Sequence, residues 1–454
     1  MKKFTYCILS CYILLFVGCS NWLDVKPTSR VEQAEMFSTE NGFKNALTGV
    51  YIQMKDKKLY GKSLTMDFTE NLAQHWKVNK SSTEGYTSMF DYKNASVEEL
   101  IDGIYTSFYN TIVNINNLLS FVDNGVLSAD LYDMVKGEAL GLRAFLHFDL
   151  LRLYGPIPGK QTDTKILAYA QKVSRDNLPM HTWQEYIAFL EKDLNDAEAL
   201  LNKIEHKGIE DDFFAYRQNR MNYWAVLALK ARFYLWIQNK EKAAEYAGKV
   251  IAGEKFKLSQ SVDFTNKDFI ASSEHLFSMH VYDLEEITEE YFYRGGGVQQ
   301  TKSLIEGDLF QNDVTDIRKA ELWKQIKETS STRFVLMKYK QGDAVHVSKE
   351  QIPLIRLYEM YLIAIECSDD ATVYQPLIDE LVHARNMSLD MTGADVNKKN
   401  KFVADEYNKE FYGEGQQFYQ YKRRNDETIM WSNIAGSESV YVLPLPKNEI
   451  KYNE

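Results

Sequence analysis

The sequence predicts a mainly α-helical protein in which tetratricopeptide-like helical hairpins form a curved scaffold, with an irregular loop-rich subdomain and a few short strands. Three observations predict this class: apolar stripes at helical spacing, capping boxes ahead of such stripes, and one stretch with the residue offsets of a helical hairpin. The 454 residues are enough for a large core, and a 26% charged, 13% aromatic composition excludes a disordered chain.

The first two predicted helices lie near the N-terminus. Residues 38–54 carry apolar side chains three and four positions apart, as one face of a helix requires. Ser96 and Glu99 have the spacing of a capping box. An apolar stripe follows over 101–122, so a long amphipathic helix is expected there.

The next two helices have clear boundary signals. Residues 129–154 predict a helix that ends at Gly155 and Pro156, because proline cannot continue a helix. Thr182 and Glu185 form a second capping box, which predicts that another helix begins directly after it.

Residues 221–253 are the most informative segment for architecture. Small and large apolar residues occupy tetratricopeptide offsets on two successive helices, with Asn239 at the turn. Residues 356–367 and 374–386 predict a second hairpin of the same kind. No strict 34-residue period runs along the chain, so the pattern indicates single hairpins and not a regular array.

Strand signals are few, and two long regions lack any periodicity. Residues 276–281 and 333–339 alternate weakly and predict short strands or extended arms. Periodicity fails over 282–332 and again over 61–92. Binding groups are often found in long irregular loops on a rigid scaffold, so these two regions are the expected location of a ligand site.

The N-terminus has the layout of a secretory signal peptide. Lys2 and Lys3 precede an apolar stretch over 4–17, which is too short to span a bilayer, and Gly18 supplies a small residue before a cleavage point. The four residues that end at Cys19 resemble a bacterial lipobox. They predict lipidation of Cys19 and attachment to a membrane surface; an ordinary secretory signal is the alternative.

Charge and cysteine content narrow the functional classes. The net charge of −11 would become −13 once Lys2 and Lys3 are removed, and an acidic chain is a poor partner for nucleic acid. Cys7 and Cys11 would leave with the signal peptide. With Cys19 acylated, Cys367 would remain alone, so no intramolecular disulfide is expected.

Five sequence blocks occur in a fixed order along the chain. They are Asn-Trp-Leu-Asp-Val-Lys-Pro at 21–27, Glu-Ala through Tyr-Gly-Pro-Ile-Pro over 138–158, Ser-Glu to Val over 273–281, Arg-x-x-Glu-x-x-Leu at 356–362, and Pro-Leu-Pro with Glu-Ile over 444–450. Together they resemble the SusD/RagB family, surface lipoproteins of Bacteroidota that work with SusC-type transporters.

This resemblance implies a domain organisation. Residues 1–18 would be the lipoprotein signal peptide and 19–454 a SusD-like domain. Within it, the helical scaffold is expected over about 30–255 and 350–390. A variable loop-rich subdomain is expected over about 256–345 and the C-terminal family segment over about 400–454.

The resemblance also implies a function. The protein would be anchored in the outer membrane, facing the extracellular side, as a lid over a SusC-like TonB-dependent barrel. It would capture an oligosaccharide and pass it on unchanged, without a cofactor and without catalysis. A peptide-binding lipoprotein of the same architecture and, less favoured, a secreted glycoside hydrolase are the alternatives.

The chain departs from the family where Glu414 and Gly415 are followed by Gln417 and Gln420 in place of an arginine and an aspartate. Two amides can still hydrogen-bond each other, so we expect a structural pair here. Four charged residues of the family blocks are likewise expected in buried inter-helix ion pairs: Glu138, Arg143, Arg356 and Glu359.

Motifs for metal or nucleophilic chemistry are not evident in the sequence. His275 and His280, five positions apart, fit neither a helical metal pair nor a zinc hairpin. Neither a Gly-x-Ser-x-Gly elbow nor a complete phosphate loop occurs. The 64 carboxylates could include a glycosidase pair, but the sequence does not indicate which two.

Aromatic residues in the two aperiodic regions supply the predicted ligand site, because sugar rings pack on aromatic rings while their hydroxyls bind polar groups. The predicted ligand-binding residues are Asp67, His75 and Trp76 in the first region and Tyr291, Tyr293, Arg294 and Trp323 in the second. Trp76 and the pair Tyr291 and Trp323 are predicted to share one ligand face. Packing in the core is the alternative for each aromatic.

Overall fold

The computed structural model describes residues 33–174, 176–209, 211–294, 297–327, 332–340 and 350–449. Its longer helices are α3 (Glu40–Met54), α6 (Ala95–Phe121), α7 (Ala129–Tyr154), α8 (Trp183–Glu205), α9 (Tyr223–Trp236), α10 (Lys240–Ala252), α14 (Leu357–Cys367), α15 (Ala371–Ala384), α16 (Val396–Glu410) and α17 (Gln417–Arg424). The predicted signal peptide and Cys19 lie outside the described residues.

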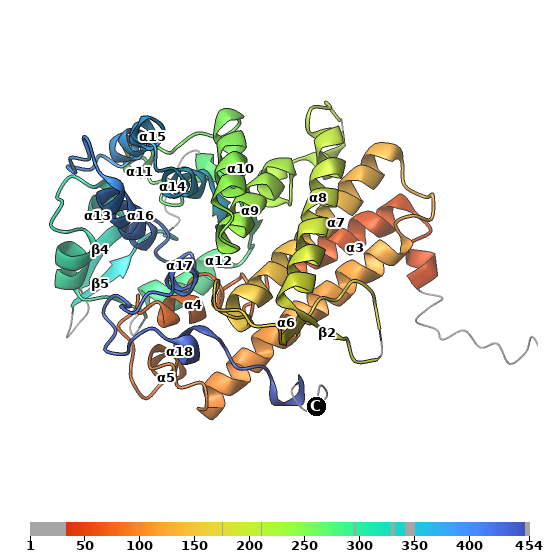
Figure 1. Cartoon of the computed structure of the whole chain (residues 1–454), viewed down its shortest axis with the longest axis horizontal. Helices are drawn as coiled ribbons and strands as arrows, with labels where there is room; N and C mark the ends of the chain where they lie inside the picture. The colour runs from red at the N-terminus through yellow and green to blue at the C-terminus, as the bar shows by residue number, and fades with distance from the viewer. Residues whose placement is uncertain are drawn as a thin grey trace, which may run out of the picture.

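The helices pack as successive antiparallel hairpins. Helix α7 contacts α8, α9 contacts α10, and α10 in turn contacts α14, which pairs with α15. Figure 1 shows these helices side by side across the upper part of the molecule. The predicted mainly helical, tetratricopeptide-like architecture is therefore confirmed.

One of the two predicted capping boxes is present in the structure, and the other is not. Thr182 and Glu185 form the predicted capping box of α8. The capping box predicted at Ser96 is wrong, because α6 begins at Ala95. Its N-cap is Asn94, whose side chain accepts a hydrogen bond from the Ser96 amide at 3.0 Å.

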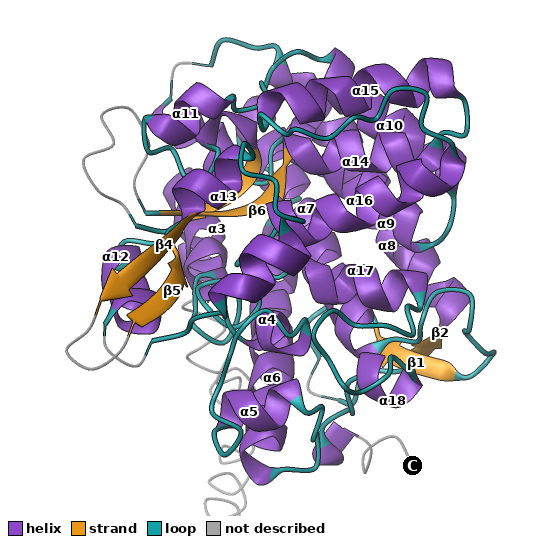
Figure 2. Ribbon diagram, turned by 90° about the vertical axis from the view of Figure 1, so that its left-hand side faces the viewer, coloured by secondary structure: helices purple, strands orange, loops and turns teal. Residues whose placement is uncertain are grey.

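Short elements fill the connections (Figure 2). The short helices are α4 (Phe68–Leu72), α5 (Thr83–Ser88), α11 (Ser261–Thr265), α12 (Leu284–Thr288), α13 (Ile317–Leu322) and α18 (Glu438–Tyr441), with π-helical turns η5 (Glu289–Tyr293) and η6 (Leu304–Leu309). The strands form three antiparallel pairs: β1 (Lys165–Ala168) with β2 (Met180–Thr182), β3 (His275–His280) with β6 (Gln351–Arg356), and β4 (Trp323–Lys327) with β5 (Thr332–Leu336). The aperiodic segment 282–332 thus contains a strand that the sequence pattern did not predict.

The four charged residues of the family blocks are all buried in ion pairs, as expected, but not with one another. Arg143 on α7 binds Asp193 on α8 at 2.7 Å. Glu359 on α14 binds Arg232 on α9 at 2.6 Å, and Glu138 pairs with Arg220 at 3.0 Å.

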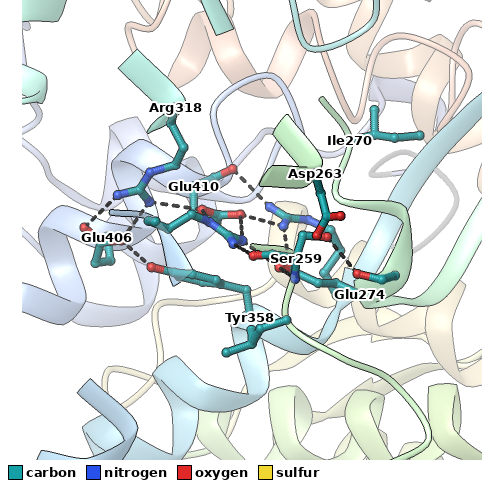
Figure 3. Close-up of polar contacts among 12 residues, drawn as sticks. Ser259, Asp263, Ile270, Glu274, Arg318, Tyr358, Glu406 and Glu410 are labelled. Atoms are coloured by element: carbon teal, nitrogen blue, oxygen red, sulfur yellow. Dashed lines mark hydrogen bonds and ion pairs between the residues drawn. The ribbon is translucent and has the colours of Figure 1, made fainter. Parts of the chain in front are cut away.

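Arg356 belongs to a larger buried network, which we call the arginine network (Figure 3). Its members are Glu274, Arg318, Arg356, Arg385, Glu406, Glu410 and Glu414. The Glu410 carboxylate accepts from three arginines, at 2.6 Å from Arg356, 2.8 Å from Arg385 and 3.0 Å from Arg318. Burial by itself would raise the pKa of Glu410, but the arginines hold it well below its usual range.

The predicted amide pair is not formed. Gln420 Oε1 instead accepts a hydrogen bond from Arg423 Nε at 3.0 Å, and Glu414 binds Arg356 and Lys338. The reason is local: Arg423 lies three residues after Gln420 on α17, so its guanidinium is within reach.

Candidate ligand cleft

A cavity of about 660 Å³ lies between residues 57–84 and 287–299, and we call it the loop cleft. Apart from Lys57, its lining residues belong to the two regions in which helical periodicity fails. A backbone hydrogen bond from Lys77 N to Gln299 O, 2.8 Å long, joins the two walls. The cleft therefore depends on contacts between segments more than 200 residues apart.

Tyr291, on η5, connects the walls through its side chain. Its hydroxyl donates to Asp67 Oδ1 at 2.8 Å, and Lys62 Nζ lies 4.4 Å from the centre of its ring. Lys62 also binds Asp67 at 3.0 Å. Burial and the Asp67 charge raise the pKa of Tyr291 well above its usual value, so the phenol stays neutral and acts as a donor.

Arg333 stabilises the second wall of the cleft, residues 287–299, by hydrogen bonds to its backbone carbonyl groups. Its guanidinium donates to the carbonyl oxygens of Phe292, Tyr293, Arg294 and Gly297 at distances of 2.8–3.1 Å. Backbone carbonyls in irregular loops need such partners when they are buried. One buried cation on β5 therefore fixes the turn that follows Tyr291.

Aromatic side chains pack beneath the cleft. Trp76 is only 4% exposed, and its Nε1 donates to Met66 O at 2.9 Å. The Trp76 and Trp323 rings both pack edge-on against Tyr412, with centroid distances of 5.1 and 5.0 Å. His75 is fully buried and stacks on the same tyrosine at 3.9 Å.

Trp76 and Trp323 thus pack against the same tyrosine in the interior, and the ligand face that they were predicted to share is not formed. With Trp323 also 4% exposed, neither indole presents a face to solvent, and His75 lies in the same core. The alternative of core packing, kept open for each aromatic, describes these three residues.

The remaining predicted site residues lie at different depths. Tyr291 lines the cleft, and Asp67 binds its hydroxyl. Tyr293 is buried, with Lys340 Nζ 4.8 Å from the centre of its ring, whereas Arg294 is exposed; neither lines the cleft.

Glu70, on α4, links the first wall of the cleft to the C-terminal part of the chain through hydrogen bonds. Its carboxylate accepts from His75 Nδ1 at 2.6 Å and from the amides of Gly413 and Gly415 at 2.8 and 2.7 Å. Gly415 has φ +74°, and a Cβ there would lie 2.2 Å from Leu64 O. Only glycine fits this close approach.

Five charged side chains that line the cleft were missed by sequence reasoning, which began from aromatic residues. They are Lys57, Lys62, Lys77, Glu84 and Glu290. Among the described residues, Lys62 pairs with Asp67, and the other four have no ion-pair partner within 4.0 Å. The available signal was their position, because all of them except Lys57 lie in the two aperiodic regions. Unpaired donors and acceptors in an open cleft can bind the hydroxyl or charged groups of a ligand.

The described ranges contain no cluster of three or more His, Cys, Asp or Glu side chains suited to holding a metal ion. No helix in them has both the length and the apolarity needed to cross a bilayer.

Known proteins share both sequence and fold with this chain. Residues 21–235 match the SusD-like family described as starch-binding and associating with the outer membrane. Two SusD-like proteins of Formosa agariphila are 24% identical over 267 residues and 21% identical over 285 residues. In sequence, the chain resembles the SusD/RagB family over a little less than half of its length. These matches cover 57% and 61% of the chain, which spans about half the length of the two relatives, 48% and 50%.

Solved SusD structures extend the likeness over almost the whole chain. A SusD superfamily protein from Bacteroides thetaiotaomicron has a TM-score of 0.74 at 20% identity, covering 91% of this chain and 98% of its own. A SusD-like carbohydrate binding protein from Bacteroides vulgatus has a TM-score of 0.73 at 17% identity, covering 91% and 96%. At these identities the likeness establishes the shared SusD fold.

Proposed function

We propose that this protein captures an oligosaccharide in the loop cleft and passes it unchanged to a SusC-like TonB-dependent transporter. In this proposal it is anchored through lipidated Cys19 to the outer membrane and faces the extracellular side. The resemblance of residues 21–235 to the SusD-like family described as starch-binding and associating with the outer membrane supports the class of function.

The observation that carries the choice of site is the lining of the cleft. Tyr291 contributes an aromatic ring held in place by Asp67 and Lys62. Around it lie lysine and glutamate side chains that have no ion-pair partner in the described ranges. Sugar rings require such a mixture of an apolar face and several donors and acceptors. A peptide is the second candidate, because unpaired side chains of both charges also suit its ionic groups.

Calorimetry with a panel of oligosaccharides and peptides tests this proposal. We expect an oligosaccharide to bind, and Tyr291→Ala to weaken its binding roughly tenfold, or about 1.4 kcal/mol. Tyr282→Ala is the matched control, because Tyr282 is 84% exposed and does not line the cleft. A peptide as the only ligand would favour the second candidate, and equal losses in both variants would place the site elsewhere.

Chromatography of the bound ligand separates binding from catalysis. An unchanged oligosaccharide after prolonged incubation is expected, whereas cleavage would support the glycoside hydrolase alternative. Pull-down of the lipoprotein from membranes in mild detergent should recover a TonB-dependent barrel. Radiolabelled palmitate should enter the wild type and not Cys19→Ala.

A further inference from the structure

The loop cleft places charged side chains of both signs around one aromatic ring. Its first wall, residues 57–84, carries five lysines and three carboxylates, in a chain whose net charge is −11. Its second wall, residues 287–299, carries two glutamates and one arginine. The charged groups that line the cavity itself are Lys57, Lys62, Lys77, Glu84 and Glu290. The lining therefore lacks the acidic excess of the whole chain.

One lysine of the lining already has partners within the protein. Lys62 Nζ lies 3.0 Å from Asp67 and 4.4 Å from the centre of the Tyr291 ring. The other two lysines and both glutamates have no ion-pair partner within the described ranges. Residues 295 and 296 of the second wall, which lie outside those ranges, are glycines and carry no charged side chain. Two ammonium groups and two carboxylates are thus left to contact a ligand.

These charges lie close to Tyr291. The Lys77 amide donates to Gln299 O at 2.8 Å, so this lysine lies where the two walls meet. Glu290 directly precedes Tyr291 on η5. Burial has the largest effect in raising the pKa of Tyr291, and the nearby charge of Glu84 raises it further. A ligand that packs on the Tyr291 ring therefore has an ammonium group and carboxylates within its reach.

The balance of charge distinguishes between classes of glycan. A bound sugar displaces water from the lining, and its hydroxyl groups restore hydrogen bonds but supply no counter-charge. A purely anionic glycan would be attracted by the lysines and repelled by the glutamates, and a purely cationic glycan would meet the reverse. A glycan that carries both signs can form charge-assisted hydrogen bonds with both kinds of group.

We propose that the loop cleft takes a glycan in which a sugar acid is next to a sugar with a free, protonated amine. The carboxylate of the sugar acid binds Lys57 and Lys77, and the ammonium group binds Glu84 and Glu290. The inference rests on the function proposed above, because it names the class of oligosaccharide for the same cleft. A volume of about 660 Å³ is within the usual range of ligand pockets and accommodates a short oligosaccharide.

Calorimetry with four disaccharides tests the inference on the intact chain. They combine glucuronic acid or glucose with glucosamine or N-acetylglucosamine in one linkage, so the carboxylate and the ammonium group are varied independently. At about pH 6 the carboxylates are ionised and the amines are protonated. We expect the disaccharide of glucuronic acid and glucosamine to bind about tenfold more tightly than the neutral one, with each charge contributing about threefold.

Substitution of the lysines tests the position of the carboxylate. Lys57→Gln/Lys77→Gln should remove the preference for glucuronic acid over glucose and retain the preference for glucosamine over N-acetylglucosamine. The matched control is Lys240→Gln/Lys257→Gln, because both lysines are exposed and neither lines the cleft. The control should retain both preferences.

Substitution of the glutamates should have the opposite effect. Glu84→Gln/Glu290→Gln should remove the preference for glucosamine and retain the preference for glucuronic acid. Glu241→Gln/Glu438→Gln is its control, since these exposed glutamates do not line the cleft. A merely structural role would lower both preferences together. If a cleft variant fails to fold, the four affinities of the wild type decide the question.

Several results would overturn the inference. Tightest binding of the neutral disaccharide, or of one with a single charge, would assign the cleft to that class of glycan. Equal effects of the cleft variants and their controls would reduce the preference to general surface charge. Equal affinity for a capped tetrapeptide with one lysine and one glutamate would show that the charges are recognised without a sugar.

Failure of this inference is distinguishable from failure of the proposed function. If none of the four disaccharides binds, but a larger oligosaccharide binds with the loss expected for Tyr291→Ala, the inference fails and the proposed function stands. If no oligosaccharide binds, both fail.

Discussion

The arginine network and the loop cleft are both rich in charged and aromatic residues, yet only one has the character of a binding site. In the network, Glu410 is buried and bonded to three arginines, so no polar group remains for a ligand. In the cleft, Lys77 and Glu84 lie in an open cavity without ion-pair partners among the described residues. Density of charge is therefore a poor guide to function, whereas unsatisfied charge in an open space is a useful one.

The largest expected effect comes from breaking the network. Glu410→Ala leaves three buried guanidinium groups without their shared carboxylate, and removing one partner of a buried ion pair typically costs about 3–5 kcal/mol. Urea denaturation should show this loss. Asp196→Ala, which removes an exposed pair with Lys192, should change the free energy of unfolding by less than about 1 kcal/mol. Similar effects of the two substitutions would contradict the comparison.

Acid should remove the stabilising contribution of the network over a wide range of pH below about 4.5. The arginine and lysine neighbours of Glu406 outweigh the effect of burial and lower its pKa from 4.5 to about 2. A carboxyl whose pKa is lower in the folded state stabilises the protein above its unfolded pKa, and this contribution is lost as the pH falls from about 4.5 towards 2.

The urea midpoint should therefore fall steeply between pH 5 and about pH 2.5. Glu406→Gln should flatten this dependence, and the exposed Glu241→Gln should leave it intact. A midpoint that is insensitive to acid in the wild type would show that the network contributes little.

Trp76→Ala should destabilise the protein by about 3 kcal/mol, because it leaves a large cavity beneath the cleft. A lowered melting temperature is the measurement, with Tyr282→Ala as an exposed aromatic control. The opposite result, an unchanged melting temperature with roughly tenfold weaker ligand binding, would return Trp76 to the ligand face.

The smallest effects on stability are expected inside the cleft. Glu84→Gln should change the free energy of unfolding by less than about 0.5 kcal/mol, because Glu84 forms no ion pair within the described part of the chain. The same variant should weaken ligand binding several-fold in calorimetry. A stable variant with unaltered affinity would exclude Glu84 from the site.

Sequence patterns predicted the helical scaffold well, because the spacing of apolar residues along an amphipathic helix shows which face of the helix is buried. Helix α7 ends at Tyr154, before the glycine and proline that mark its end, and the Thr182 capping box opens α8.

The cleft was harder to predict because its parts are not periodic. The two regions were identifiable, but the depth of Trp76 depends on Tyr412, more than 300 residues away, and no local pattern reports such a contact.

The hydrogen bonds from Gly413 and Gly415 to Glu70 affect the order in which the parts of this protein can fold. Helix α4 lies early in the chain, but it cannot complete its native contacts until residues 412–415 have been synthesised. Two further links have the same character: Tyr92 donates to Val440 O, and Leu443 N donates to Leu153 O. The hairpins have mostly local contacts and can assemble while the chain is still emerging. The cleft would then be the last part to close, so a prematurely terminated chain would retain much of its helix content and lack a site.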